Sequence, residues 1–172
     1  MRFLFLLAAL LPTLAHADPV PALVSVCFVP GEACGAQIAA AIDAARSEVR
    51  VQAYGFSARP ILTALAAARA RGVDVAIILD KSDAPKLCAV DAELLAAGVP
   101  VWIDHLPGIA HNKVIVIDRH VVIGGSYNFT RSAETRNAEN VTIIDSAAVA
   151  ARFLANWQAR QAVAQSTSGL CG

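Results

Sequence analysis

The sequence alternates between two kinds of segment, and this alternation limits the folds that are open to it. Short runs rich in β-branched residues, such as residues 24–29 and 73–79, have the length and composition of strands. Between them lie Ala-rich segments with apolar residues at helical spacing, such as residues 35–46 and 57–71. Strands and helices in alternation build a sheet that helices cover. We therefore expect an α/β fold.

The second half of the chain predicts that the sheet is mixed. Residues 113–117 and 121–123 are two apolar runs separated by a short polar stretch, residues 118–120, which is the pattern of a β-hairpin. Hairpin strands are antiparallel, whereas strands joined through a helix are parallel. A further strand is expected over residues 140–144. The expected fold is a mixed β-sheet flanked by helices on both faces.

The C-terminal segment has the pattern of one more helix. Ser146 is a residue type that favours helix N-caps, and the helix is expected to run to Gln161. Phe153, Leu154 and Trp157 are expected on one face of it, against the sheet.

The first seventeen residues have the organisation of a secretory signal peptide. Arg2 supplies the positive charge, residues 3–14 are apolar almost throughout, and small residues flank His16 as in a cleavage site. A spanning helix needs about 20 apolar residues, so the run is too short for one, although an uncleaved anchor is the alternative. We expect cleavage before Asp18 and a single domain over residues 18–172. The mature protein would be periplasmic or secreted, without stable membrane association.

Charge is balanced over the chain. It carries 14 basic and 14 acidic residues, and loss of Arg2 with the signal leaves 13 against 14. An overall positive field therefore cannot drive binding to nucleic acid, and a local cluster must supply any phosphate affinity. The candidates are Lys113, Arg119, Arg131 and Arg136, of which Arg119 is the most typical of an ordinary surface charge.

Four cysteines remain after cleavage: Cys27, Cys34, Cys88 and Cys171. Four cysteines allow three pairings, and an oxidising compartment favours disulfides. A Cys27–Cys34 bridge would close a short loop and leave Cys88 and Cys171 to fasten the C-terminal tail. The sequence has no CxxC pair typical of zinc sites and no carboxylate cluster typical of Mg²⁺ or Ca²⁺ sites. We expect no metal and no other cofactor.

Residues able to carry chemistry are concentrated between His111 and Glu139. Residues two apart on a strand point to the same face, so His111 and Lys113 share a face. Ser126 and Asn128 do so too if that segment is extended. An imidazole, an ammonium, a hydroxyl and a carboxamide in fixed positions can supply a nucleophile and several donors to phosphate oxygens.

Each of these features is weak when taken singly. A histidine at the start of a strand is usually structural, a lysine is usually a solvated charge, and Gly-Gly-Ser is usually a turn. Gly124 and Gly125 lack side chains and would allow the backbone to approach a ligand closely. The joint spacing of these residues is what favours a functional interpretation.

That spacing resembles the phospholipase D superfamily signature, HxKxxxxDxxxxxxGS, which His111, Lys113, Asp118, Gly125 and Ser126 fill. Other stretches resemble the small bacterial EDTA-resistant endonucleases of the Nuc type, namely residues 53–56, 71–75, 125–130, 133–137 and 156–158. The resemblance extends from Cys27 to Trp157 and implies the phospholipase D/nuclease fold.

The resemblance also implies roles. His111 would attack phosphorus and form a covalent phosphohistidine. Lys113 and Asn128 would bind the non-bridging oxygens, and Ser126 would add a hydrogen bond. Glu139 would accept a bond from Nδ1 of His111 and leave Nε2 free to attack.

The family mechanism needs a second histidine, which protonates the leaving oxygen and then activates water. Larger members carry two motifs, whereas this chain carries one, because neither His105 nor His120 is followed by lysine two residues later. The missing half would come from a second subunit, so we expect a homodimer with one composite active site. The alternative is a monomer in which His105 or His120 is the acid. Asp118 differs in parity from His111 and Lys113, which predicts a structural role for it.

Three functions are compatible with these residues. The first is a metal-independent, non-specific endonuclease acting on DNA, with RNA as an open alternative. The second is a phospholipase D-type lipid phosphodiesterase, although the chain lacks large insertions that would build an acyl-binding tunnel. The third is a catalytically idle nucleic-acid-binding module, which would have no need of His111, Lys113 and Glu139 together. We expect the endonuclease.

Overall fold

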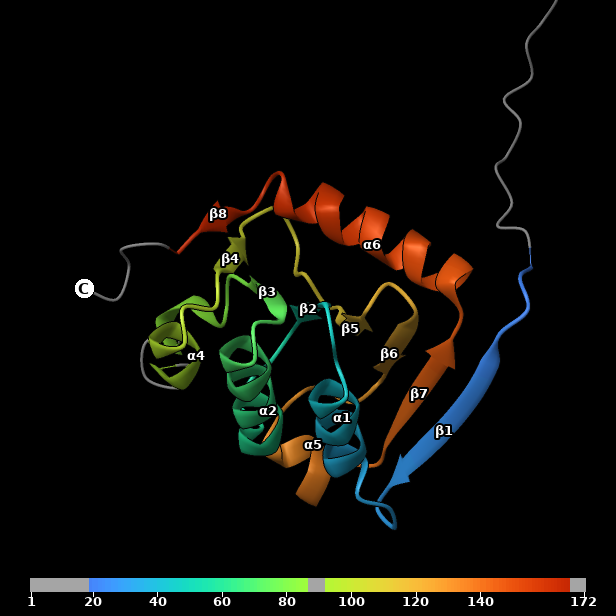
Figure 1. Cartoon of the computed structure of the whole chain (residues 1–172). Helices are drawn as coiled ribbons and strands as arrows, with labels where there is room; N and C mark the ends of the chain where they lie inside the picture. The colour runs from blue at the N-terminus through green and yellow to red at the C-terminus, as the bar shows by residue number, and fades with distance from the viewer. Residues whose placement is uncertain (1–18, 87–91, 168–172) are drawn as a thin grey trace, which may run out of the picture.

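The fold was described from a computed structural model that covers residues 19–86 and 92–167 (Figure 1). The expected signal peptide, Cys88 and Cys171 lie outside the described residues. The described part contains one eight-stranded sheet with the order β1-β7-β6-β5-β2-β3-β4-β8. Its strands are β1 (Leu23–Val29), β2 (Glu48–Ala53), β3 (Asp74–Asp80), β4 (Val101–Asp104), β5 (Lys113–Ile117), β6 (Val121–Gly125), β7 (Glu139–Asp145) and β8 (Gln165–Ser166).

The sheet is mixed, as the sequence predicts. Strands β2, β3 and β4 are parallel neighbours. All other neighbouring pairs, including the β5–β6 hairpin, are antiparallel. Because β5 pairs with β2, the hairpin joins the middle of the sheet instead of extending one edge.

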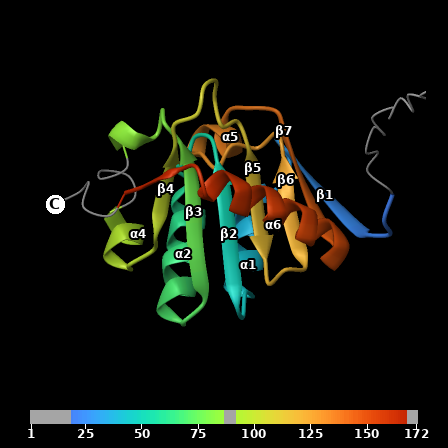
Figure 2. The same ribbon diagram turned by 90° about the horizontal axis from the view of Figure 1, so that it is seen from above.

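Helices cover both faces of the sheet (Figures 1 and 2). One face carries α1 (Cys34–Asp43), α2 (Arg59–Ala70), α4 (Ala92–Ala96) and α5 (Arg131–Thr135), and the other carries α6 (Ala147–Gln161). A short 3₁₀ turn, Ala84–Lys86, follows β3. The α/β class with helices on both faces is therefore confirmed.

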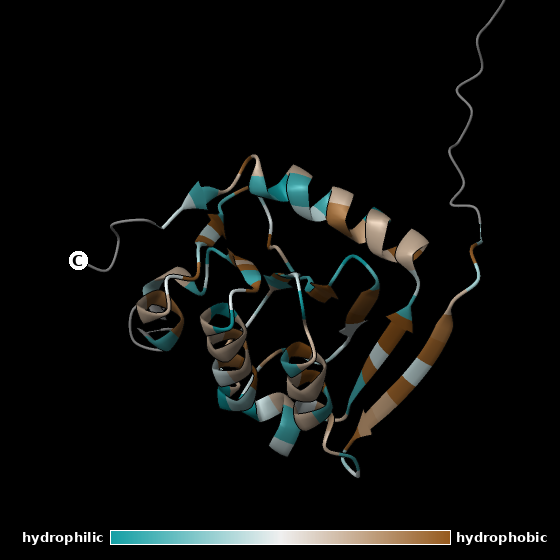
Figure 3. Cartoon of the chain, viewed as in Figure 1, coloured by the Kyte–Doolittle hydropathy of each residue, from teal (hydrophilic) through white to brown (hydrophobic). Residues whose placement is uncertain are grey.

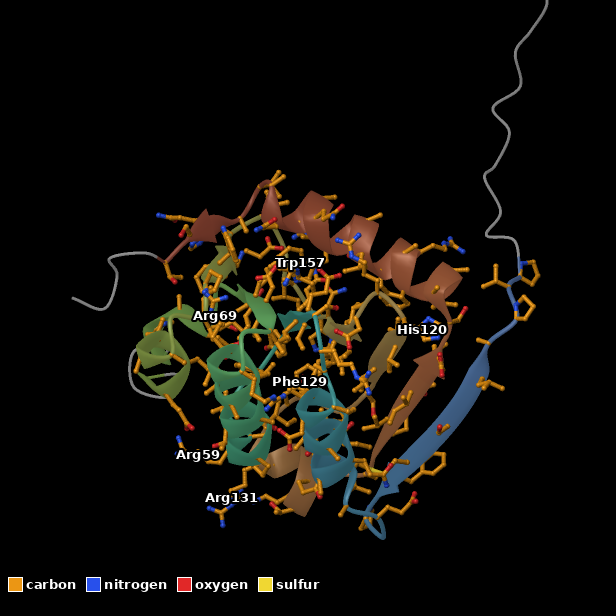
Figure 4. All side chains as sticks on the ribbon, viewed as in Figure 1. Arg59, Arg69, His120, Phe129, Arg131 and Trp157 are labelled. Carbon is orange, nitrogen blue, oxygen red and sulfur yellow. A yellow bond between two sulfur atoms is a disulfide. The ribbon has the colours of Figure 1, made fainter. Side chains whose placement is uncertain are left out.

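The largest core lies between the sheet and helices α1 and α2, where the apolar stripes of both helices are buried. A smaller cluster joins Val116 and Val122 of the hairpin to Ala150 and Leu154 of α6. Trp157 fastens α6 to the centre of the sheet, because its indole Nε1 donates to the backbone oxygen of Val51 at 2.8 Å (Figure 4). No helix of the described residues is long and apolar enough to cross a membrane.

The last helix departs from expectation in two details. Ser146 is the N-cap residue of α6, as expected, but its hydroxyl donates to the backbone oxygen of Pro21 and makes no capping bond. Leu154 and Trp157 are buried, whereas Phe153 is 36% exposed. Neighbouring residues on a helix are about 100° apart, so Phe153 falls beside the buried stripe.

The edge strand β1 leaves an apolar strip uncovered. Val24, Val26 and Phe28 share one face and are exposed, as is Leu23 at the start of the strand, and the strand is coloured hydrophobic over most of its length in Figure 3. Its opposite face is buried through Cys27 and lies against α1.

Candidate active site

The motif residues meet at the edge of the sheet that is formed by the ends of the strands, away from the edge strands β1 and β8. They meet there because neighbouring strands run in opposite directions. His111 precedes β5, Ser126 and Asn128 follow β6, and Glu139 begins β7. The carboxyl end of β2 lies at the same edge, since Ala53 pairs with Lys113. Residues of four strands, from Ala53 to Glu139 in sequence, are thus brought together at the strand ends.

His111 is exposed, and its imidazole lies against the ring of Tyr54. The two ring centroids are 4.6 Å apart and the planes are inclined at 61°. Tyr54 follows β2, and its backbone N–H donates to the oxygen of Asn112 at 2.9 Å. The histidine is therefore held beside β2 by one ring contact and one backbone bond to the adjacent residue.

Lys113 is buried, with 8% of its surface exposed. Its Nζ donates to the backbone oxygen of His111 at 2.9 Å and lies 5.2 Å from the centroid of the Tyr54 ring. Burial lowers the pKa of Lys113 from its usual value, and the nearby Glu139 carboxylate partly offsets this. A desolvated ammonium at the site offers a phosphate oxygen a stronger interaction than a solvated one.

Both carboxylate oxygens of Glu139 accept hydrogen bonds. Ser126 Oγ donates to Oε2 at 2.5 Å, and Asn137 Nδ2 donates to Oε1 at 2.7 Å. The backbone N–H of Asn140 donates to Ser126 Oγ at 3.0 Å. In this arrangement the single hydroxyl proton of Ser126 is directed to Glu139, so Ser126 holds the carboxylate. The bond from His111 to Glu139 remains a prediction.

Asn128 is half-buried, and its Oδ1 is enclosed without a hydrogen-bond partner. The side chain lies next to Gly55, where an added Cβ would be 3.8 Å from Asn128 Cβ and 3.2 Å from Thr130 Cγ2. Gly55 has a φ of +73°, and its N–H donates to Asp83 Oδ2 at 2.9 Å. A tight turn after β2 thus packs directly against the segment that carries Asn128.

Of the two glycines before Ser126, Gly125 is required by the packing of the strand and Gly124 is not. Gly125 has a φ of +140°, and a Cβ on it would lie 2.3 Å from the backbone oxygen of Asn140. A side chain is therefore excluded by β7 itself. A Cβ on Gly124 would lie 3.5 Å from the backbone oxygen of Lys113, an ordinary contact. Close approach to a ligand remains a prediction for both.

A second network supports the segment from the side of α1. Tyr127 OH and the backbone N–H of Gly35 both donate to Glu134 Oε2, at 2.8 and 3.0 Å. Burial, followed by the bond to Glu134, raises the pKa of Tyr127. The neighbouring Cys34 forms a disulfide with Cys27, as one of the three expected pairings requires.

Asp118 lies at the opposite end of β5 from His111. It has a φ of +51°, and its carboxylate accepts bonds from Arg46 N, Ser47 N, Ser47 Oγ and Glu48 N at 2.7 to 3.0 Å. Burial acts to raise the pKa of Asp118, but these hydrogen bonds outweigh it and hold the pKa below its usual value. The carboxylate joins the hairpin turn to the start of β2.

Other charged candidates divide between the two edges. His120 lies in the hairpin turn with Asp118, where its Nε2 is 2.5 Å from Asp145 Oδ1. A five-residue strand spans roughly 17 Å, so His120 cannot act as the acid for His111 in the same chain. Arg119 is also at the far edge and pairs with Glu48, which removes it from the expected phosphate-binding cluster.

At the edge where His111 lies, Arg131 begins α5 and Arg136 follows it, and both are exposed. Within residues 19–86 and 92–167, no three His, Cys, Asp or Glu side chains gather closely enough to hold a metal ion. Lys113 is the buried cation among the motif residues.

The loop before His111 is fastened to β3. Asp80 is buried, and its carboxylate accepts bonds from Ala110 N at 2.7 Å and Ser82 N at 2.9 Å. Lys81 Nζ donates to the backbone oxygen of Leu106 at 3.2 Å. These bonds fix the approach of the chain to His111 and β5.

Sequence reasoning missed two residues of the site, Tyr54 and Asn137. Tyr54 lies within the stretch 53–56, but its contact with His111 depends on β2 being adjacent to β5. Asn137 is two residues before Glu139, a separation at which an Asn side chain can reach a neighbouring acceptor.

Comparison with known proteins agrees with this geometry. Residues 38–160 match the family model described as "Cardiolipin synthase, PLD-like domain". A phospholipase D from Rickettsia bellii is 49% identical over 139 residues, which are 81% of this chain and 69% of the relative. The human mitochondrial cardiolipin hydrolase is 34% identical over 121 residues, 69% of this chain and 48% of that protein.

Among solved structures, the crystal structure of a phospholipase D family member, Nuc from Salmonella typhimurium, has a TM-score of 0.77 to this chain. It is 35% identical, and the match covers 85% of this chain and 98% of Nuc. The chain therefore belongs to the phospholipase D superfamily of phosphodiesterases and has the fold of Nuc.

Proposed function

We propose that this phosphodiesterase is a metal-independent endonuclease that hydrolyses DNA through a covalent intermediate on His111. The observation that carries the proposal is the convergence of His111, Lys113 and Glu139 at one edge of a sheet that matches Nuc over 98% of the Nuc chain. Within the described residues there is one sheet, and helices cover both of its faces.

In the proposed first step, His111 Nε2 attacks phosphorus, the phosphorus–nitrogen bond forms and the bond to the leaving oxygen breaks. Lys113 and Asn128 bind the non-bridging oxygens, where negative charge increases in the transition state. A second, protonated histidine gives its proton to the leaving oxygen. That histidine then takes a proton from water, which attacks phosphorus and releases His111.

The second histidine would be His111 of another copy of the chain. His120 lies at the far edge of the sheet, so it cannot supply this proton within one chain. A two-fold axis beside the catalytic edge would bring two His111 side chains to one phosphate. The exposed apolar strip of β1 supports association with a second copy, because soluble monomers rarely leave such strips uncovered.

Export is part of the proposal. The buried Cys27–Cys34 disulfide is typical of proteins that fold in an oxidising compartment, which agrees with the expected signal at residues 1–17. The enzyme would then meet nucleic acid in the periplasm or outside the cell.

The experiment is a digestion of plasmid DNA by the purified protein in excess EDTA, run beside phosphatidylcholine vesicles. Wild-type protein should cleave the plasmid with EDTA present, and His111→Ala should not. His120→Ala is the matched control and should keep full activity, because His120 pairs with Asp145 far from the site. Loss of wild-type cleavage in EDTA would contradict metal independence. Cleavage by the His111→Ala protein would show that His111 is not the nucleophile.

Lipid hydrolysis is the second candidate, because a relative 49% identical to the chain is named phospholipase D. The vesicle reaction decides between the two. Release of choline at a rate above that of plasmid cleavage would favour the lipid.

Sedimentation and dilution test the dimer. Specific activity should fall when the protein is diluted through the concentration at which sedimentation detects dissociation. A fully active monomer would contradict the composite site.

A further inference from the structure

A cavity of about 430 Å³ opens beside the catalytic edge, between the N-terminal ends of α1 and α2 and the helix α5. Its walls are small and apolar and include Ala36, Ala58, Pro60 and Ile61. Cavities of this size accommodate small organic groups. None of these four residues takes part in the proposed chemistry.

The cavity is continuous with the segment that carries the phosphate-binding residues. Tyr127 and Thr130 line it, and Asn128 lies between them in sequence. Thr130 is extended, with φ −127° and ψ 156°, and both Asn128 and Thr130 pack against Gly55. The backbone N–H of Thr130 donates to the oxygen of Asn128 at 2.6 Å and closes a tight turn between them. The cavity therefore begins within two residues of Asn128, close enough for a group next to the bound phosphate to reach it.

Two arginines from different helices stand at the mouth of the cavity. Arg59 begins α2, and Arg131 begins α5 (Figure 4). Arg59 is 72% exposed in its side chain and lies 3.3 Å from Glu93. The acidic group inside the cavity, Glu134, already accepts bonds from Tyr127 and Gly35. The mouth is therefore cationic around an apolar interior.

This combination fits a polynucleotide better than a lipid. A polynucleotide carries a phosphate on each nucleotide, so a strand held at His111 would present a second phosphate to Arg59 and Arg131. A lipid held by its headgroup phosphate would bring an uncharged acyl ester to the same place and offer no anion to Arg131 or to Arg59, which pairs with Glu93. A base can enter the cavity only when it is unpaired and unstacked.

We infer that the cavity between α1, α2 and α5 binds the unpaired base of the nucleotide next to the scissile phosphate. Arg59 and Arg131 bind the following phosphate, so the preferred substrate is single-stranded nucleic acid. This inference rests on the proposed nuclease function and adds a subsite to it.

The test measures binding separately from cleavage. A short fluorescent oligothymidylate and the same oligomer with abasic sites are titrated against His111→Ala protein, which cannot turn them over. The abasic oligomer should bind roughly tenfold more weakly, as loss of a base contact predicts. The added substitution Ala36→Phe, at an exposed position of α1, fills the cavity and should abolish the difference between the two oligomers.

Two matched controls distinguish the effect of filling the cavity on binding from the effect of removing a positive charge. Ala40→Phe changes an exposed alanine of the same helix outside the cavity and should retain the abasic difference. Arg131→Ala should weaken both oligomers about tenfold, whereas Arg46→Ala, at the opposite edge, should weaken neither by that amount.

Cleavage assays then separate the subsite from the function. With bis(p-nitrophenyl) phosphate, which has no neighbouring nucleotide, Ala36→Phe should turn over like wild type, while its KM for single-stranded DNA should rise roughly tenfold. Equal abasic and intact binding by the His111→Ala protein would overturn the subsite while leaving the nuclease proposal intact. The subsite would also be overturned if Ala36→Phe lowered activity on phospholipid vesicles and left activity on single-stranded DNA unchanged. Tighter binding of the intact oligomer than of the abasic one, with no nuclease activity in wild type, would overturn the proposed nuclease function and keep the base subsite.

Discussion

The ring of Tyr54 lies against the imidazole of His111, with the centroids 4.6 Å apart, and Lys113 Nζ is 5.2 Å from the centroid of the same ring. One aromatic side chain, which directly follows β2, therefore lies against two motif residues at the start of β5. The ring restricts the positions of the His111 and Lys113 side chains, which would otherwise be free to change rotamer.

Tyr54→Ala should lower kcat about tenfold to a hundredfold, because small displacements of a nucleophile have effects of this size. Tyr54→Phe keeps the ring and should retain near wild-type kcat. Steady-state hydrolysis of bis(p-nitrophenyl) phosphate measures both. A Tyr54→Ala protein with unchanged kcat would show that the ring contact has no positioning role.

Ser126 should act through Glu139, since its hydroxyl donates to that carboxylate at 2.5 Å. Ser126→Ala is expected to lower kcat about tenfold, and Glu139→Ala about a hundredfold. Because Ser126 acts only through Glu139, either change disrupts the same interaction. The double variant should therefore be no slower than Glu139→Ala. Effects that multiply instead would mean that Ser126 bonds the phosphate independently of Glu139.

Lys113→Met should abolish turnover and stabilise the fold. Burial lowers the pKa of Lys113, so the ammonium is held in the folded protein at a cost that a similar apolar side chain avoids. Thermal and urea unfolding should give a free energy of unfolding higher by up to about 1 kcal/mol. Arg46→Met, at an exposed position on the opposite edge, is the control and should leave turnover unchanged. A strongly destabilised Lys113→Met protein would assign the lysine a structural role.

Asp118→Asn should destabilise the protein by roughly 2 kcal/mol at neutral pH, because the charged acceptor holds four donors from residues 46–48. The folded-state pKa of Asp118 lies below its usual value. Its carboxylate therefore stabilises the fold above about pH 4, and this contribution is lost as the pH falls through the folded-state pKa.

The difference in unfolding free energy between wild type and Asp118→Asn should accordingly shrink on acidification below about pH 4. Urea unfolding at a series of pH values measures this difference. A difference that persists unchanged into strong acid would mean that the charge of Asp118 is not what matters. Turnover per folded molecule should stay near that of wild type, since Asp118 is at the far end of β5.

Much of the fold could be predicted because its signals are local. The β5–β6 hairpin follows from two apolar runs around Asp118, and the mixed sheet follows from that hairpin and the helices between earlier strands. That His111 and Lys113 share a face could be predicted from their spacing alone. Residues two positions apart on a strand point to the same face, whatever the neighbouring strands are.

The remaining features depend on contacts between distant segments. Tyr54 reaches His111 only because β5 pairs with β2, a neighbour separated from it by two strands in sequence. The hydroxyl of Ser146 bonds Pro21 in preference to its own helix, a partner 125 residues away. The cavity beside the site is assembled from three helices, so no single stretch of the sequence indicates it.

The most direct measurement is the capture of the covalent intermediate on His111. Protein mixed with DNA in excess EDTA, quenched rapidly in alkali and digested, should yield the peptide containing His111 with a phosphoryl-linked nucleotide on the imidazole. Mass spectrometry should find the adduct transiently in wild type and not in His111→Ala. Turnover in EDTA with no adduct at any quench time, or an adduct on another residue, would contradict nucleophilic attack by His111.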